Sequence, residues 1–136
     1  MTGFTLTRSI AAAPERVWSA FTNADEYAAW IWPVEWNTVC SIDLRIGGEF
    51  RVASEQVGLS IRGTYVEIDP ITRLVMNWLP TGSTDETVLT ISIEPTATGT
   101  ELILTHENFA DDQSREAHEQ GWTDCLSRLP AYVGAL

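Results

Sequence analysis

The chain has 136 residues, which we expect to form one domain over 1–136, and its formal charge is −11 although all eight of its Lys and Arg positions are arginine. This charge argues against nucleic acid and against anionic membrane surfaces as partners, because both attract clustered Lys and Arg. Cys40 and Cys125 lack the spacing of metal ligands, so we expect two reduced thiols and a cytoplasmic protein. No apolar run approaches the roughly 18 residues of a membrane span, so we expect the protein to be soluble.

The first 30 residues predict one strand and two short helices. Apolar and polar residues alternate from 4 to 10, which is typical of a strand. Pro14 is favoured at the first position of a helix, and it begins a short segment with one apolar face. Asn23, followed by Glu26 three residues later, resembles a capping box and predicts a second helix that ends near Trp30.

Six further strands are predicted between Val39 and Glu107. Gly, Pro and polar residues interrupt the apolar pattern at five places, which are 47–48, 56–58, 69–70, 80–85 and 95–99. Because connections of two to six residues join neighbouring antiparallel strands, these breaks predict a meander. The strand over 59–68 has apolar residues at both parities, so its inward face is not assigned.

The last predicted element is a long amphipathic helix that begins near Asp111. Its apolar residues recur at three- and four-residue steps and form one face, comprising Trp122, Cys125, Leu126, Leu129, Tyr132, Val133 and Leu136. One long helix against a curved antiparallel sheet leaves a pocket between the two layers. The sequence therefore predicts an α+β fold with seven strands, two short helices after the first strand and a long C-terminal helix.

Gly121 lies where the apolar face of this helix begins. A glycine inside a helix costs about 1 kcal/mol relative to alanine. Such a residue usually marks the close approach of another backbone or of a ligand, and we predict one of these two contacts at Gly121.

Several short segments together resemble one known family. They are Ala13–Trp18, Asp43–Phe50, Arg62–Gly63, Glu67–Pro70, Arg73–Val75 and His118–Trp122. Through these segments, from about Arg8 to Leu129, the chain is similar to the family related to the C-terminal domain of the heat-shock protein 90 ATPase activator. That family belongs to the START-like (SRPBCC) helix-grip superfamily, together with polyketide cyclases and the birch-pollen-allergen-like lipid binders. The resemblance implies a curved seven-stranded antiparallel sheet wrapped around the C-terminal helix, with a ligand cavity between them.

Strand parity predicts which side chains face such a cavity. One apolar face comprises Phe50, Val52, Leu74, Met76, Trp78, Leu89, Ile91, Ile93, Leu102, Leu104 and His106. Packing of the C-terminal helix against the sheet would by itself also explain the aliphatic members of this set.

Five tryptophans are expected near one end of the domain. Trp30, Trp32 and Trp36 lie in one connection, and Trp78 and Trp122 lie on elements that should face it. Their flat rings and single N–H donors suit a slot for a planar or apolar ligand, and a small aromatic core that seals the sheet is the alternative. The predicted ligand contacts are Trp30, Trp32, Trp36, Phe50, Val52, Met76, Trp78, Leu89, Ile91, Leu104, His106, Gly121, Trp122 and Leu126.

Few polar residues could perform chemistry in this cavity. His106 has inward parity and Glu35 lies in the tryptophan-rich connection, so they are the candidate acid and base pair, although a hydrogen-bonded histidine at a strand end is the alternative for His106. His118 and Glu119 resemble the start of a zinc-binding helix, but Trp122 occupies the position of the second histidine, so we expect no metal. The chain has no phosphate-binding or dinucleotide motif, and we expect no cofactor.

Three functions are left open by the sequence. The first is a module that binds a small apolar or aromatic molecule. The second is an acid and base enzyme of the cyclase or hydratase type that uses the same cavity. The third, implied by the resemblance, is a module that interacts with a chaperone. The sequence also leaves open whether the protein forms a homodimer. The fold cannot separate these functions, because function resides in the site.

Overall fold

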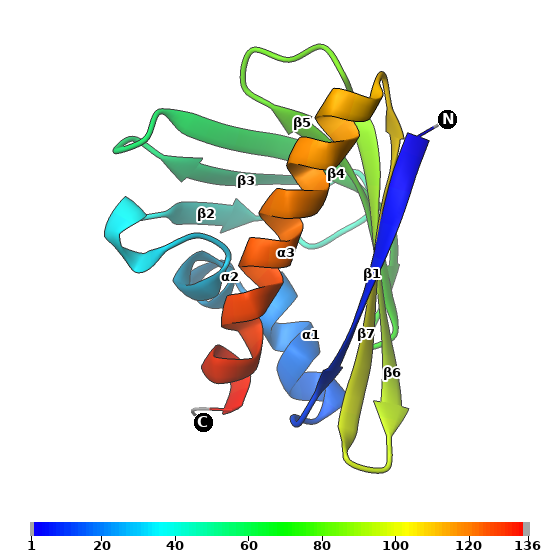
Figure 1. Ribbon diagram of the computed structural model, residues 1–136. Helices are drawn as coiled ribbons and strands as arrows, with labels where there is room; N and C mark the ends of the chain where they lie inside the picture. Colours follow the sequence, from blue (N-terminus) through cyan, green and yellow to red (C-terminus); the bar gives the residue numbers. More distant parts are fainter. Residues whose placement is uncertain (1, 135–136) are drawn as a thin grey trace.

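A seven-stranded sheet and three α-helices make up the computed structural model, which describes residues 2–134 (Figure 1). The elements are β1 (Thr2–Ile10), α1 (Pro14–Thr22), α2 (Ala24–Trp30), the 3-10 turn η1 (Val34–Trp36), β2 (Val39–Ile42), β3 (Glu49–Ser54), β4 (Leu59–Asp69), β5 (Arg73–Pro80), β6 (Thr87–Thr96), β7 (Gly99–Phe109) and α3 (Asp112–Gly134). Every predicted strand break separates two strands. Leu136, expected on the helix face, lies outside the described residues.

The sheet is antiparallel throughout and has the order β1-β7-β6-β5-β4-β3-β2. It curves strongly, so that β2 and β3 run steeply across the direction of β1, β6 and β7, and α3 lies along the concave side (Figure 1). The predicted α+β helix-grip fold is therefore confirmed. Helices α1 and α2 lie beside the C-terminal half of α3, with α2 next to β2 and α1 next to β6 and β7 (Figure 1).

The inward faces of the strands follow the predicted parity. All eleven side chains assigned to the apolar face, including His106, are buried. Strand β4 buries Ile61 and Tyr65, and a register shift between Tyr65 and Glu67 then changes its parity, which leaves Val66 exposed. Because a β-bulge adds one residue to one strand, it explains why apolar residues occur at both parities over 59–68.

Asn23 forms half of the predicted capping box. Its side chain accepts a hydrogen bond from the backbone N–H of Glu26 at 3.1 Å. The Glu26 carboxylate instead accepts hydrogen bonds from Ser19 and Arg16 of α1 and from Tyr132 of α3, the last at 3.4 Å. Burial opposes ionisation of Glu26, but the Ser19 and Arg16 hydrogen bonds outweigh it and lower the pKa of this carboxyl. Glu26 therefore joins all three α-helices.

Arg128 fastens α3 to the end of α2. Its Nε donates to the carbonyl of Trp30 at 2.9 Å, and its Nη2 donates to the carbonyl of Ile31 at 2.7 Å. These are carbonyls that a helix end leaves without partners inside the helix. Asp124, one turn away on α3, accepts from Nη1 at 2.7 Å. The connection that follows α2, beginning with Ile31 and Trp32, is thereby held against α3.

None of the three α-helices within residues 2–134 is both long enough and apolar enough to cross a membrane. The longest, α3, carries exposed charged side chains, including Asp112, Glu116 and Asp124.

Candidate functional site

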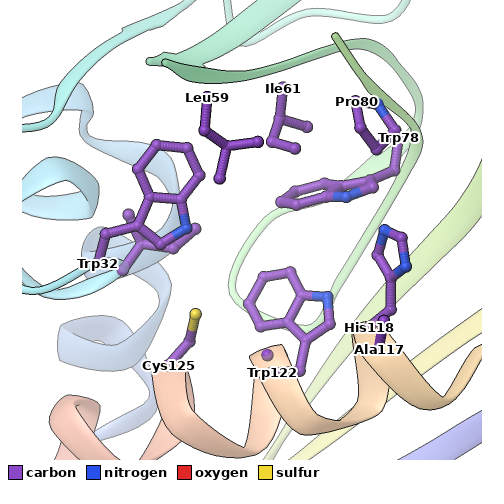
Figure 2. A pocket seen from close by; sticks show the side chains of 11 residues that line it. Trp32, Leu59, Ile61, Trp78, Pro80, Ala117, His118, Trp122 and Cys125 are labelled. Carbon is purple, nitrogen blue, oxygen red and sulfur yellow. The ribbon is translucent and has the colours of Figure 1, made fainter. Parts of the chain in front are cut away.

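A pocket of about 240 Å³ lies between the inner side of β4 and β5 and the first half of α3. Its residues come from four parts of the chain, as the close view shows (Figure 2). They are Ile31, Trp32, Leu59, Ile61, Trp78, Pro80, Ala117, His118, Gly121, Trp122 and Cys125. The lining contains no Asp, Glu, Lys or Arg, so the pocket is apolar and carries no fixed charge.

Three indole rings surround this space, with Trp32 across the pocket from Trp78 and with Trp122 rising from α3 (Figure 2). All three side chains are largely buried, at 8%, 4% and 3% exposed for Trp32, Trp78 and Trp122. The ring centroids of Trp78 and Trp122 are 5.2 Å apart and their planes are inclined by 50°. Trp32 packs against Trp36, with 5.6 Å between centroids. Flat aromatic surfaces therefore bound the pocket on several sides.

His106 lies behind two of these tryptophans and connects them. The Trp122 Nε1–H donates to His106 Nδ1 at 3.2 Å, so that nitrogen has no hydrogen of its own. The hydrogen is on Nε2, which donates to Thr87 Oγ1 at 2.6 Å. The Thr87 hydroxyl donates in turn to the carbonyl oxygen of Trp78 at 3.1 Å. This buried chain fixes one neutral tautomer of His106 and positions both pocket tryptophans.

The structure does not support His106 as an acid or base at neutral pH. Its side chain is 0% exposed, and burial, with a smaller contribution from the facing His118, lowers its pKa to about 3. The imidazole is therefore neutral at pH 7, and it matches the alternative of a hydrogen-bonded histidine at a strand end. Glu35 is exposed on η1 and does not line the pocket, so the structure does not bring the candidate acid and base together there.

His118 is the imidazole that does reach the pocket. Its Nδ1 lies 2.9 Å from the carbonyl oxygen of Ser114, one turn earlier in α3. Because a carbonyl only accepts, Nδ1 carries the hydrogen, and Nε2 of the neutral ring is an acceptor. Within residues 2–134 no hydrogen-bond partner occupies Nε2. The ring packs against Phe109 and His106, with centroid distances of 4.9 and 5.3 Å.

Two further polar groups belong to the lining. The indole N–H of Trp78 is buried without a hydrogen-bond partner in the part of the chain that the structure describes. Burial raises the pKa of the Cys125 thiol to about 12, a rise that Asp124 assists and Arg128 opposes. Since the thiolate is the nucleophilic form, Cys125 is unreactive at pH 7 and acts as a small apolar wall residue.

Four of the predicted ligand contacts line the pocket, namely Trp32, Trp78, Gly121 and Trp122. Trp36 is half-buried behind Trp32. The others are buried but lie outside the lining, and they are Trp30, Phe50, Val52, Met76, Leu89, Ile91, Leu104, His106 and Leu126. The pocket does not reach these nine side chains, so their contact with a ligand stays a prediction.

The tryptophans divide between the two predicted alternatives. Trp30 belongs to a small aromatic core, where its Nε1–H donates to the carbonyl of Ala20 at 2.9 Å and its ring meets Phe21 and Tyr27 edge-on. Trp32, Trp78 and Trp122 line the pocket instead, and binding of a ligand between them stays a prediction.

Sequence reasoning missed His118 as a pocket residue, although a periodicity could have found it. His118, Trp122 and Cys125 are separated by four and three residues, which places them on one helix face. Leu59 and Ile61 were missed because the parity of their strand was ambiguous. Pro80 and Ala117 gave no comparable indication.

Gly121 does not mark the close approach of another backbone. A Cβ built there would have no atom within 4 Å outside its own helix, and the residue is exposed. That part of the expectation is wrong. Gly121 does line the pocket, so contact with a ligand stays a prediction.

We expect Gly121→Ala to raise the free energy of unfolding by about 1 kcal/mol, because alanine is the better helix former and the added methyl meets open space. Urea unfolding followed by tryptophan emission would measure the change. Gln120→Ala, at the exposed neighbouring position, is the matched control and should stay within about 0.5 kcal/mol of the wild type. A loss of stability in Gly121→Ala would contradict the open space.

The fold and the pocket together define a helix-grip protein, in which a curved sheet holds a long helix over an apolar slot. The sequence model for activator of Hsp90 ATPase homolog 1-like proteins matches residues 11–134, and the chain belongs to that family. The predicted resemblance is therefore confirmed. No curated protein is significantly similar to the chain in sequence.

Solved structures with the same fold come from several sources. Protein CV1439 from Chromobacterium violaceum is 27% identical with a TM-score of 0.81, and the similarity covers 96% of both chains. PFC0360w, an HSP90 activator from Plasmodium falciparum, is 23% identical with a TM-score of 0.79, covering 98% of this chain and 97% of that one. DynU16, a protein in the dynemicin biosynthetic locus, is 21% identical with a TM-score of 0.82, covering 97% of this chain and 47% of the other. The last two similarities establish the fold alone.

Proposed function

We propose that this protein binds a small apolar or aromatic molecule in the pocket between β4, β5 and α3. The observation that carries the proposal is the arrangement of three indoles around a space with no charged side chain. Apolar pockets with a few polar groups are the usual form of small-molecule sites. Flat indole faces favour planar ligands, with which they stack.

Titration with naphthalene tests the proposal, because this ligand is planar, neutral and free of polar groups. We expect a saturable change in tryptophan emission and a matching heat in calorimetry. Ala117→Phe should weaken or abolish binding, since Ala117 lines the pocket and a phenyl ring would occupy part of it. Ala131→Phe, on the exposed side of the same helix outside the lining, is the matched control. The proposal fails if naphthalene and related neutral aromatics give no saturable response.

An acid and base enzyme of the cyclase or hydratase type is a second candidate. His118 favours it, because an imidazole in an apolar pocket can exchange protons with a bound substrate. His118 takes the place of His106 and Glu35 as the candidate acid or base, because neither of those two residues lines the pocket. If a substrate that the protein converts is found, His118→Gln should remove its turnover. A separate binding measurement would show whether the variant still holds the ligand.

Interaction with a chaperone is the third candidate, and its support is membership of a family named for activation of the Hsp90 ATPase. Measuring the ATPase rate of heat-shock protein 90 with and without this protein would test it. A cytoplasmic location and a homodimer stay proposals as well. The two free cysteines, Cys40 and Cys125, accord with a reducing compartment.

A further inference from the structure

The volume of the pocket suits a small ring system. The space is about 240 Å³. An apolar cavity of roughly 150 Å³ accepts benzene, whereas sites for drug-sized molecules span about 300–1,000 Å³. The pocket lies between these two cases. Its size fits one or two fused rings, and the rest of a longer ligand would lie outside it.

Two polar atoms of the lining next to His106 lack a partner within residues 2–134. The Trp78 Nε1–H is a donor, and Nε2 of neutral His118 is an acceptor. Both rings pack against His106, with centroid distances of 5.8 Å for Trp78 and 5.3 Å for His118, so the two atoms belong to one end of the pocket (Figure 2). A buried donor without a partner is energetically costly, and a ligand that supplies one removes that cost.

The absence of charged side chains from the pocket lining favours a neutral ligand. The lining has no cationic side chain to pair with a carboxylate or phosphate, and the whole chain carries a formal charge of −11. An anion would therefore lose its hydration and gain no counter-ion. The lining also has no carboxylate to pair with a cation, although indole faces can attract one.

We propose that the ligand is a neutral hydroxylated aromatic of one or two rings, whose hydroxyl donates to His118 Nε2 and whose oxygen can accept from the Trp78 indole N–H. The aromatic part lies among Trp32, Trp78 and Trp122. A hydroxyl satisfies both unpaired atoms because it donates and accepts at once. This inference rests on the proposed binding function and specifies the chemistry of its ligand.

A series of naphthalenes of nearly equal size tests the inference on the wild-type protein by calorimetry. The probes are naphthalene, 2-naphthol, 2-methoxynaphthalene, 2-naphthoate and N-methylquinolinium. We expect 2-naphthol to bind about fivefold to tenfold more tightly than 2-methoxynaphthalene, which has the oxygen but no hydrogen to donate. Naphthalene should also bind more weakly than 2-naphthol, although it is the more hydrophobic of the two. The anion and the cation should bind more weakly than 2-naphthol.

The possible results distinguish failure of the hydroxyl contact from failure of ligand binding itself. Equal or tighter binding of naphthalene would overturn the hydroxyl contact and leave the binding function in place. Tightest binding of 2-naphthoate or of N-methylquinolinium would likewise overturn the inference in favour of an ionic ligand. If no member of the series binds, the inference and the proposed function fall together.

His118→Phe identifies the acceptor. Phenylalanine keeps an aromatic ring against Phe109 but removes Nε2, so the affinity ratio of 2-naphthol to 2-methoxynaphthalene should fall to about one. A ratio unchanged from the wild type would overturn the role of His118. If the substitution prevents folding, the calorimetry series on the wild-type protein still tests the hydroxyl contact by itself.

Discussion

Gly63→Ala is expected to destabilise the domain by roughly 3 kcal/mol or more, through overpacking of a buried strand pair. A Cβ at Gly63 would lie 1.9 Å from the carbonyl oxygen of Asn77 and 2.6 Å from Cε2 of Phe50. The oxygen belongs to the backbone of β5, so a rotamer change cannot relieve the clash. The methyl fits only if β4 and β5 move apart, which would displace the neighbouring Trp78. Urea unfolding measures the loss.

Gly121→Ala is the matched control for this substitution, because it adds the same methyl where no atom lies within 4 Å. The two variants should change stability in opposite directions. If Gly63→Ala keeps wild-type stability, the two strands must be able to separate at little cost. A folded Gly63→Ala variant that no longer binds naphthalene would show that the position of Trp78 depends on this glycine.

The fold could be predicted because its main features repeat along the chain. Alternation within strands, turn residues between them and the three- and four-residue steps of α3 are each local patterns, and the structure has them where predicted. Pro14 and Asn23 also mark helix starts through their own chemistry. The bulge after Tyr65 was not predictable in this way, since it depends on pairing with β5.

The pocket was only partly predictable, because parity identifies the side chains that face inward and does not show which of them another element covers. Leu89, Ile91 and Leu104 face inward as expected, yet they are completely buried and lie outside the pocket. The same limit applies to His106. Its inward position was predicted, whereas its hydrogen bonds to Trp122 and Thr87 depend on three elements meeting in space.

Acidification should destabilise the protein through His106, well above the range in which carboxylates titrate. Burial, assisted by His118, lowers the pKa of His106 from 6.5 to about 3 in the folded protein. The unfolded chain therefore binds a proton below pH 6.5 that the folded protein excludes, so stability is fully present above this pH and falls as the pH drops towards 3. The slope is about 1.4 kcal/mol per pH unit, which gives a loss of about 2 kcal/mol at pH 5. Urea unfolding at pH 7.5, 6 and 5 would measure it.

Two variants assign this loss to one imidazole. His106→Gln cannot take up a proton, so its free energy of unfolding should change much less between pH 7.5 and 5. His118→Gln should retain most of the slope, because burial is the larger cause of the low pKa of His106 and the charge of His118 is the smaller one. Glu26, whose pKa is lowered from its usual 4.5, loses its contribution only at lower pH. An equal slope in His106→Gln and in the wild type would mean that His106 is not held neutral, and the hydrogen-bonded chain from Trp122 to Thr87 would then lose its fixed tautomer.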